Sequence, residues 1–289
     1  TLISKNLSKQ LPGSPTVVAQ FMPGGGGIKM ANYLYNVAPR NGTVIGLIYD
    51  GVPTAQLLYP NRGIKYKSEG FTPLGSLAAY DPGLIAVLKN APATTIAGVK
   101  KIEVILGAGG KGVNQYIVPN LLNKMVNTKF KIVLGYRGIS TILTAMERGE
   151  VHGTLGSYSI WQQVRPQWVS EGKLRWLVQM ALERHADLKD VPLMQEIVTN
   201  QKHKDVIEFM TLGRTMTKSL MAPPEIPADR AAMLRAGVMK MGKDGSFVAA
   251  AKKQRINIEA RPWQRLQKII QATIGTKTEV VELTRKLMK

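Results

Sequence analysis

Cysteine is absent from this chain of 289 residues, and so are the residue patterns of several common reactive sites. Without cysteine there is no disulfide scaffold, thiol nucleophile or cysteine-based zinc or iron–sulfur site. The 3 histidines (His152, His185 and His203) show no H-E-x-x-H spacing, and no G-x-S-x-G nucleophile motif occurs. We therefore expect no catalytic residues, no metal site and no cofactor.

Acidic residues are scarce: 19 Asp and Glu oppose 39 Lys and Arg, which gives a formal net charge of +20. The excess is spread along the chain, with one local concentration at 252–268. Nucleic-acid binders more often gather positive charge on one stripe interleaved with aromatics, so we expect no nucleic-acid partner. A diffuse positive charge attracts small anions or simply favours solubility, and both interpretations stay open.

Long hydrophobic runs are missing as well. The longest uncharged stretch, 11–28, contains three prolines and five glycines and cannot form a spanning helix. The length and the 44% hydrophobic content suit two globular domains. The chain opens with Thr1 on an apolar helical face at 1–11 and carries no basic-then-apolar leader, so we expect that processing or truncation has removed an N-terminal piece.

Strand and helix patterns alternate along the rest of the chain. Short apolar runs predict strands at 16–20, 43–49, 71–79, 84–88, 102–106, 130–134, 174–180 and 219–222. Periodic apolar positions predict helices at 28–36, 114–126, 139–148, 228–241, 261–274 and 278–287. Such alternation is typical of an α/β fold with parallel sheets.

Two glycine-rich turns join predicted strands to helices. Gly107–Gly112 matches G-x-G-x-x-G in the strand–helix context of a dinucleotide fingerprint, and Arg137 after the next strand could meet an NADP 2′-phosphate. A more general interpretation is that backbone N–H groups at the helix start bind some anion, and a plain turn is a third. Pro23–Gly27 is either a second close-approach turn or a flexible one.

Several stretches together resemble the Bug-type solute receptors of tripartite tricarboxylate transporters. They are Val17–Gly27, Ala31–Thr43, Gly107–Gly112, Gly135–Gly138, Ala145–Val151, Val191–Glu196 and Ala222–Arg235. No single stretch is decisive, but their order and spacing cover essentially the whole chain. The family's chains begin with a strand and a glycine-rich loop before the segment that matches Thr1–Leu11. The resemblance therefore implies that part of the ligand site precedes this sequence.

The resemblance implies an α/β fold of the two-domain periplasmic binding protein type (Venus-flytrap, type II-like), with parallel-rich sheets and hinge crossovers. Domain 1 would comprise 1–98 and 221–289, and domain 2 would comprise 99–220. Such a receptor is not an enzyme. It resides in the periplasm, is expected to be a monomer, and delivers a small organic anion, such as a carboxylate or dicarboxylate, to membrane permease subunits.

The ligand-binding residues implied by the resemblance lie in two groups. They are Gly24, Gly25, Gly26, Gly27, Tyr49, Asp50, Gly109, Gly110, Lys111, Gly112, Asn114, Tyr136, Arg137, Gly138 and Ser157. His152 stands where the family often has an acidic residue, and this position and that of Asn114 face the family's cleft. The alternative function is an NADP-dependent oxidoreductase that uses Gly107–Gly112 as its dinucleotide turn, although no catalytic acid or Tyr-Lys pair stands out downstream.

Overall fold

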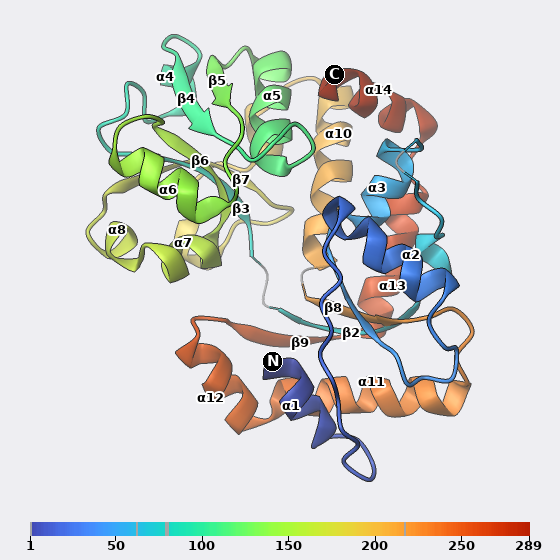
Figure 1. Cartoon of the computed structure of the whole chain (residues 1–289). Helices are drawn as coiled ribbons and strands as arrows, with labels where there is room; N and C mark the ends of the chain where they lie inside the picture. Colours follow the sequence, from blue (N-terminus) through green and yellow to red (C-terminus); the bar gives the residue numbers. More distant parts are fainter. Residues whose placement is uncertain (1, 62, 79–80, 217) are drawn as a thin grey trace. The chain divides into compact units, whose positions relative to one another are not determined.

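The chain forms two compact units in a computed structural model that describes residues 2–61, 63–78, 81–216 and 218–289 (Figure 1). Unit 1 comprises Thr1–Tyr80 and Leu212–Lys277, and unit 2 comprises Asp81–Thr211 and Thr278–Lys289. The chain therefore passes between the units three times. No helix in the described ranges is both long and apolar enough to cross a membrane.

Unit 1 is built on a 4-stranded sheet in the order β1-β8-β2-β9. Its strands are β1 (Gly46–Ile48), β8 (Ser219–Ala222), β2 (Thr72–Ala78) and β9 (Ile258–Pro262). All three pairings are antiparallel. The sheet thus joins segments from both ends of the chain, because β8 and β9 follow the return from unit 2.

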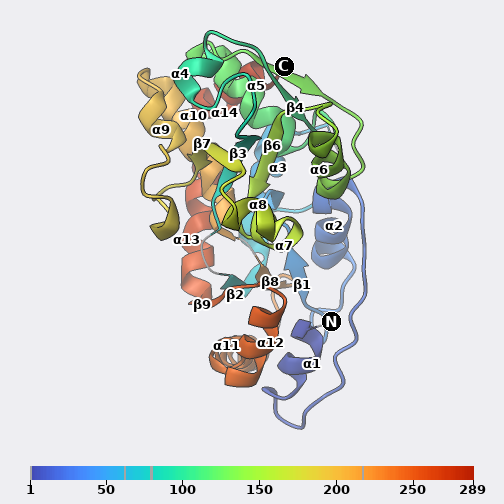
Figure 2. The ribbon, with the colours of Figure 1, turned by 90° about the vertical axis from the view of Figure 1, so that its left-hand side faces the viewer.

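Helices cover both faces of this sheet (Figures 1 and 2). On one face α1 (Leu2–Ser8), α11 (Ala228–Lys243) and α12 (Gly245–Lys253) bury a core with Leu74, Leu77 and Leu220. On the other, α2 (Ile28–Asn36), α3 (Val52–Leu58) and α13 (Trp263–Ile274) pack around residues of the strands and of η2 (Ser68–Gly70) and η4 (Gly213–Met216).

Unit 2 contains a 5-stranded sheet in the order β5-β4-β6-β3-β7. Its strands are β3 (Gly83–Leu88), β4 (Val104–Gly107), β5 (Phe130–Val133), β6 (Gly153–Ser157) and β7 (Leu174–Met180). β4 pairs in parallel with β5 and β6, whereas β3 is antiparallel to β6 and β7. The carboxyl ends of β4, β5 and β6 therefore lie along one edge, where the following turns lead into helices.

The helices of unit 2 hold these turns in place. α6 (Ile139–Glu147), α7 (Tyr158–Val164) and α8 (Pro166–Ser170) share a core with Ala86 and Leu174. α5 (Asn114–Val126) packs on β5 and β6, and α14 (Thr278–Met288) packs on α5. The carbonyl oxygen of Leu287 accepts a hydrogen bond from Lys124 Nζ at 2.9 Å. The other elements of this unit are α4 (Ile96–Val99), η3 (Ala186–Leu188), α9 (Met194–Ile197) and α10 (Gln201–Leu212).

Most of the predicted elements are present, and four match their expected bounds: α2, α5, β7 and β8. The prediction of a strand at 16–20 is wrong, because this segment has no strand structure and forms no backbone pairing in the described residues. Strand β1 is shorter than expected, and residue 79 of the predicted strand 71–79 lies outside the described residues. The expectation of parallel-rich sheets is wrong for unit 1, whose pairings are antiparallel.

The division into units differs from the expected domain boundaries. β3 belongs to the sheet of unit 2, so the chain enters unit 2 at Asp81, whereas the expected domain 2 begins at residue 99. The chain returns to unit 1 at Leu212, whereas the expected return to domain 1 is at residue 221, and the C-terminal helix α14 is part of unit 2. Local sequence patterns identify strands and helices, but they do not say which sheet a strand joins.

Candidate functional site

Two turns lie side by side at the carboxyl edge of the unit 2 sheet. One follows β4 at 108–113, and the other follows β5 at 134–138. The amide of Ala108 donates to the carbonyl oxygen of Val133 at 2.8 Å, and the amide of Tyr136 donates to the carbonyl oxygen of Ala108 at 3.4 Å. A Cβ on Gly109 would lie 3.1 Å from the carbonyl oxygen of Tyr136, so only glycine fits this contact without movement.

Each turn leads directly into a helix whose first residue has no side-chain cap. Val113 precedes α5 and Gly138 precedes α6, and neither can accept a hydrogen bond through its side chain. Within the described part of the chain, the N–H groups of Gly110, Lys111 and Gly112 donate no hydrogen bond. Unpartnered N–H groups at helix starts, together with the positive end of the helix dipole, favour an anion.

The backbone N–H of Gly109, one of the predicted anion-binding donors of this turn, already has a hydrogen-bond partner within the protein. The N–H of Gly109 donates to Gln115 Oε1 at 3.4 Å, across the start of α5. Gln115 was not among the predicted site residues, and no feature of the sequence distinguishes its side chain from other helix-surface amides. The donors that remain for an anion are therefore those of Gly110–Gly112, Asn114 and Gln115, because the amides of Tyr116 and Ile117 donate to the carbonyl oxygen of Val113 at 3.0 Å.

Cationic side chains accompany both turns. Lys111 and Arg137 are exposed, and neither forms an ion pair with a described residue. Asn114 is half-buried at the first position of α5. Burial raises the pKa of the Tyr136 phenol, with a smaller contribution from Glu150, so Tyr136 is a neutral hydrogen-bond donor near neutral pH. The predicted residues of unit 2 thus present backbone donors and two exposed cations along one edge, whereas the ring of Tyr136 packs against the core that includes Ile142 and Met146.

Ser157 ends β6 at this same edge and occupies the N-cap position of α7, without a capping hydrogen bond from its side chain. Its hydroxyl oxygen lies 3.3 Å from that of Ser159, which donates to Asp81 Oδ2 at 2.6 Å. The amide of Ser159 also donates to Asp81 Oδ1 at 3.0 Å, so this carboxylate covers the start of α7. Asp81 is the first residue of unit 2, and its role became visible only once β6 and α7 were placed beside it.

The second predicted group lies in unit 1. Four successive glycines have φ values of 140°, 58°, 65° and 93° at Gly24–Gly27, a backbone conformation that other residues rarely adopt. A Cβ on Gly27 would lie 3.0 Å from the Cβ of Tyr49, so the turn passes directly against this residue. No strand precedes this turn in the described residues, in contrast to the expected strand–helix context.

Tyr49 and Asp50 follow β1 and precede α3. The Tyr49 residue is 55% exposed despite its contact with the glycine turn. The carbonyl oxygen of Asp50 lies 2.9 Å from the position of a Cβ on Gly213, which ties this segment to η4. The structure therefore brings Gly27 and Tyr49 together within unit 1, and the two turns of unit 2 together within unit 2.

His152 has a structural role in place of the one expected from the resemblance. It immediately precedes β6, at the end of the strand opposite to the carboxyl edge. Its Nδ1 accepts the amide proton of Ile105 at 2.9 Å, and its own amide donates to the carbonyl oxygen of Ile105 at 2.8 Å. Partial burial lowers its pKa, although Glu103 opposes this shift. The expectation that this position lines the site is wrong for this chain.

The described residues differ in what they offer to a metal ion and to a dinucleotide. No group of three or more His, Asp or Glu side chains among them could hold a metal ion. The turn after β4 does have the strand–turn–helix context of a dinucleotide fingerprint. That context alone does not distinguish a pyrophosphate from a smaller anion, so the comparison with known proteins is decisive for the class of protein.

Solved structures of similar fold are bacterial solute-binding proteins. A Polaromonas TctC solute-binding protein has a TM-score of 0.69 and 20% identity, and the match covers 99% of this chain and 90% of that one. An R. palustris protein solved with adipate has a TM-score of 0.66 and 21% identity, and the match covers 99% of this chain and 91% of that one. MatC from Rhodopseudomonas palustris, solved with malate, has a TM-score of 0.64 and 21% identity, and the match covers 100% of this chain and 92% of that one. These likenesses confirm the two-domain periplasmic binding protein fold.

A search of curated proteins finds no match to the chain. The family model described as "Tripartite tricarboxylate transporter family receptor", however, matches residues 2–285. This match spans nearly the whole chain and agrees with the motifs and the fold. The protein therefore belongs to the tripartite tricarboxylate transporter receptor family.

Proposed function

We propose that this receptor captures a small organic carboxylate between its two domains in the periplasm and delivers it to the permease subunits of a tripartite tricarboxylate transporter. The observation that carries the proposal is the pair of adjoining turns in unit 2, with glycine N–H groups, Lys111 and Arg137 beside two uncapped helix starts. The carboxylate ligands of the two Rhodopseudomonas palustris proteins, adipate and malate, support the ligand class.

The turn after β4 is proposed to bind the carboxylate itself. Hydrogen bonds from the N–H groups of Gly110–Gly112 to a charged oxygen contribute about 1.5–3 kcal/mol each. No side chain stands in the way, since a Cβ on Gly110 would have no heavy atom within 4 Å. Lys111 and Arg137 add long-range attraction, which increases the rate at which an anion reaches the turn.

Unit 1 is proposed to bind the remainder of the ligand through Gly24–Gly27, Tyr49 and Asp50. The glycine backbone carries no Cβ atoms and is suited to close approach, and Tyr49, which is exposed, has a polar tip on an apolar ring. Capture would then require the two domains to close about the passages of the chain between them. A ligand drives such closure only by making contacts in the closed state that the open state lacks.

The proposal can be tested by measuring the binding of a panel of mono-, di- and tricarboxylates, first by thermal shift and then by calorimetry. We expect at least one carboxylate to bind with 1:1 stoichiometry and to stabilise the protein. NADPH is included because the turn after β4 also suits a pyrophosphate. Binding of NADPH without any carboxylate binding would favour the oxidoreductase and contradict the receptor function proposed here.

A further inference from the structure

A group of lysines on unit 1 is not used by the proposed ligand site. Two lie on or just after α1, two in the last turn of α11 and two at the end of α12: Lys5, Lys9, Lys240, Lys243, Lys252 and Lys253. We call them the lysine cluster. All six are exposed, and none forms an ion pair within the described part of the chain.

The helices that carry the lysine cluster pack together as one structure. Leu7 and Leu11 share a buried core with Val238, Met241 and Phe247, and the side-chain Nε2 of Gln10 donates to Asp244 Oδ2 at 3.3 Å. A Cβ on Gly237 would lie only 2.7 Å from Leu11 Cδ2, so α1 lies close against α11. The end of α11 adjoins the start of α12, and the shared core holds the three helices that carry the lysines in one rigid part of unit 1.

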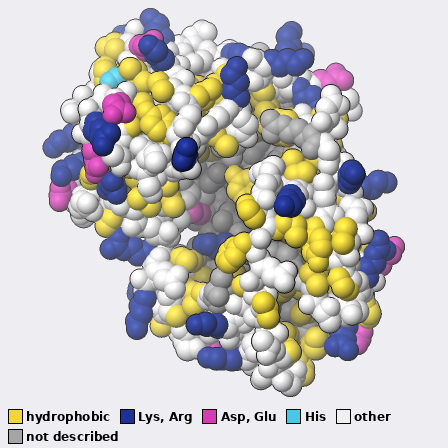
Figure 3. Space-filling model, viewed as in Figure 1, with side chains coloured by type: hydrophobic (Ala, Val, Ile, Leu, Met, Phe, Trp, Pro, Cys, Tyr) yellow, Lys and Arg dark blue, Asp and Glu magenta, His cyan; other side chains and the backbone are white. Residues whose placement is uncertain are grey.

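Two acidic groups nearby, Asp244 and Glu259, offset only part of the charge of the six lysines. Asp244 caps α12, where its Oδ1 accepts the amide proton of Phe247 at 2.8 Å. Glu259 is held by Arg261 in a pair of hydrogen bonds at 3.0 and 2.9 Å. Figure 3 shows Lys and Arg side chains gathered over the part of unit 1 that contains α1 and α12, with few Asp or Glu among them.

We propose that the lysine cluster binds the surface of a membrane that contains anionic phospholipid. Groups of four to eight Lys or Arg on one surface are typical of such binding, and each adds about 1 kcal/mol near the headgroups. Lysine ammonium groups on flexible stems suit a fluid layer of phosphates, because they need no fixed partner geometry. A structured acidic protein surface would instead be matched by arginine and exposed aromatic side chains, whereas Phe247, the aromatic residue of α12, is 1% exposed.

This inference is independent of which ligand the receptor binds. Helix dipoles also favour positive charge at helix C-termini, and that local effect accounts for lysines at the end of each helix taken alone. It does not require the three helices that carry them to share one core. A receptor held weakly at the membrane surface would search for its permease in two dimensions instead of three.

The test measures binding of the whole protein, without ligand, to sedimenting vesicles. Vesicles of equimolar phosphatidylglycerol and phosphatidylcholine are compared with vesicles of phosphatidylcholine alone. We expect binding to the first only, and we expect it to fall steeply with salt, because the Debye length shrinks from about 8 Å at physiological ionic strength to about 3 Å at 1 M.

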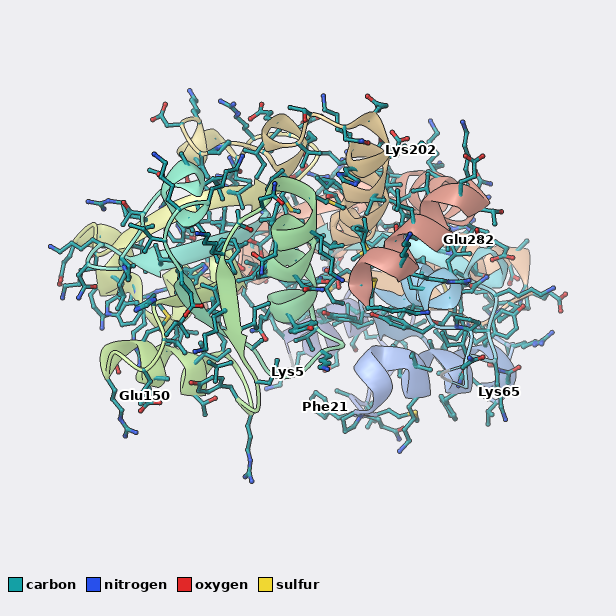
Figure 4. All side chains as sticks on the ribbon, turned by 90° about the horizontal axis from the view of Figure 1, so that it is seen from above. Lys5, Phe21, Lys65, Glu150, Lys202 and Glu282 are labelled. Carbon is teal, nitrogen blue, oxygen red and sulfur yellow. The ribbon has the colours of Figure 1, made fainter. Side chains whose placement is uncertain are left out.

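Two variants with the same net charge distinguish binding through the lysine cluster from binding through the positive charge of the chain as a whole. The cluster variant carries Lys5→Gln, Lys9→Gln, Lys252→Gln and Lys253→Gln. The control variant carries Lys89→Gln, Lys100→Gln, Lys189→Gln and Lys202→Gln, all exposed lysines of unit 2. Figure 4 labels Lys5 on α1 and Lys202 at the start of α10.

The cluster variant should bind anionic vesicles at least about tenfold more weakly than the unmodified protein, and the control variant should bind almost as well. Circular dichroism confirms that both variants are folded. The proposal is overturned if the unmodified protein does not bind anionic vesicles, or if the control variant loses as much affinity as the cluster variant.

Discussion

Replacing Gly110 with valine tests the proposed anion turn with little disturbance of the fold. Gly110 does not have a positive φ, and a Cβ added there would meet no heavy atom within 4 Å. The isopropyl group should therefore fit without a clash, and a surface change of this kind alters the free energy of unfolding by about 0.5 kcal/mol or less. The same group would cover the N–H groups that the carboxylate is proposed to use.

The expected loss follows from the hydrogen bonds. One bond to a charged oxygen is worth about 1.5–3 kcal/mol, and about 1.4 kcal/mol is a tenfold change in Kd. Gly110→Val should therefore weaken binding of the best carboxylate of the panel by roughly 10- to 100-fold, as measured by calorimetry. Neighbouring Gly109 is unsuitable for this test, because its Cβ would press on the carbonyl oxygen of Tyr136 at 3.1 Å.

A matched control is available in unit 1. Gly245 also lacks a positive φ and has open space around its Cβ position, but it lies at the start of α12 in unit 1 and belongs to neither group of predicted site residues. Gly245→Val should leave Kd unchanged. If Gly110→Val folds normally and binds the carboxylate with unaltered Kd, the turn after β4 is not the anion site.

Further predictions concern ligand linkage, pH and closure. A carboxylate at a hundredfold excess over its Kd should stabilise the protein by about 2.7 kcal/mol and raise Tm by roughly 5–10 °C in a thermal-shift assay; a flat Tm across a broad anion panel would contradict the receptor function. The pKa of His152 is lowered in the fold, so its contribution to stability should be present above its ordinary pKa of 6.5 and decrease as the pH falls below that value. His152→Ala should lose this pH dependence and cost about 1–3 kcal/mol at neutral pH by leaving the Ile105 amide unpartnered, as chemical denaturation at several pH values can show; an unchanged pH dependence in that variant would refute the assignment. Small-angle scattering should show a smaller radius of gyration with ligand than without, and an unchanged radius for a ligand of proven affinity would argue against closure.

Sequence patterns predicted the parts of the site that depend on local structure. The helix over Asn114–Val126 is periodic and follows a glycine-rich turn, and the structure has it with these bounds. The next strand and helix also appear close to their expected positions, which places the Arg137–Gly138 turn beside the first. Parallel β-α-β connectivity was sufficient for this inference because all of its elements are adjacent in the chain.

Strand β6 was missed for a reason that the structure makes clear. Its sequence, Gly153–Ser157, contains two glycines and little apolar periodicity, so it does not look like a strand. A Cβ on Gly153 would lie 2.1 Å from the carbonyl oxygen of Ala86, which shows that glycine is needed where the backbone of β3 comes close. This requirement comes from a neighbouring strand far away in the sequence, and no local pattern records it.

The opposite error occurred at 16–20, where the β-branched residues favour a strand. Val18 is 73% exposed, and the segment forms no backbone pairing with the described residues. Strand propensity expresses how well side chains fit a pleated, half-buried surface. It produces a strand only where a neighbour supplies that surface, and a single sequence window does not contain this information.

The most direct test of the carboxylate site is a two-dimensional ¹H–¹⁵N spectrum of protein labelled only at its 28 glycines, recorded during titration with the tightest-binding carboxylate of the panel. Gly110→Val and Gly245→Val spectra assign the two signals that matter most. We predict that the amide of Gly110 shifts in proportion to ligand occupancy, while that of Gly245 does not move. Saturation by a ligand of proven affinity with the Gly110 signal unmoved would contradict the site proposed here.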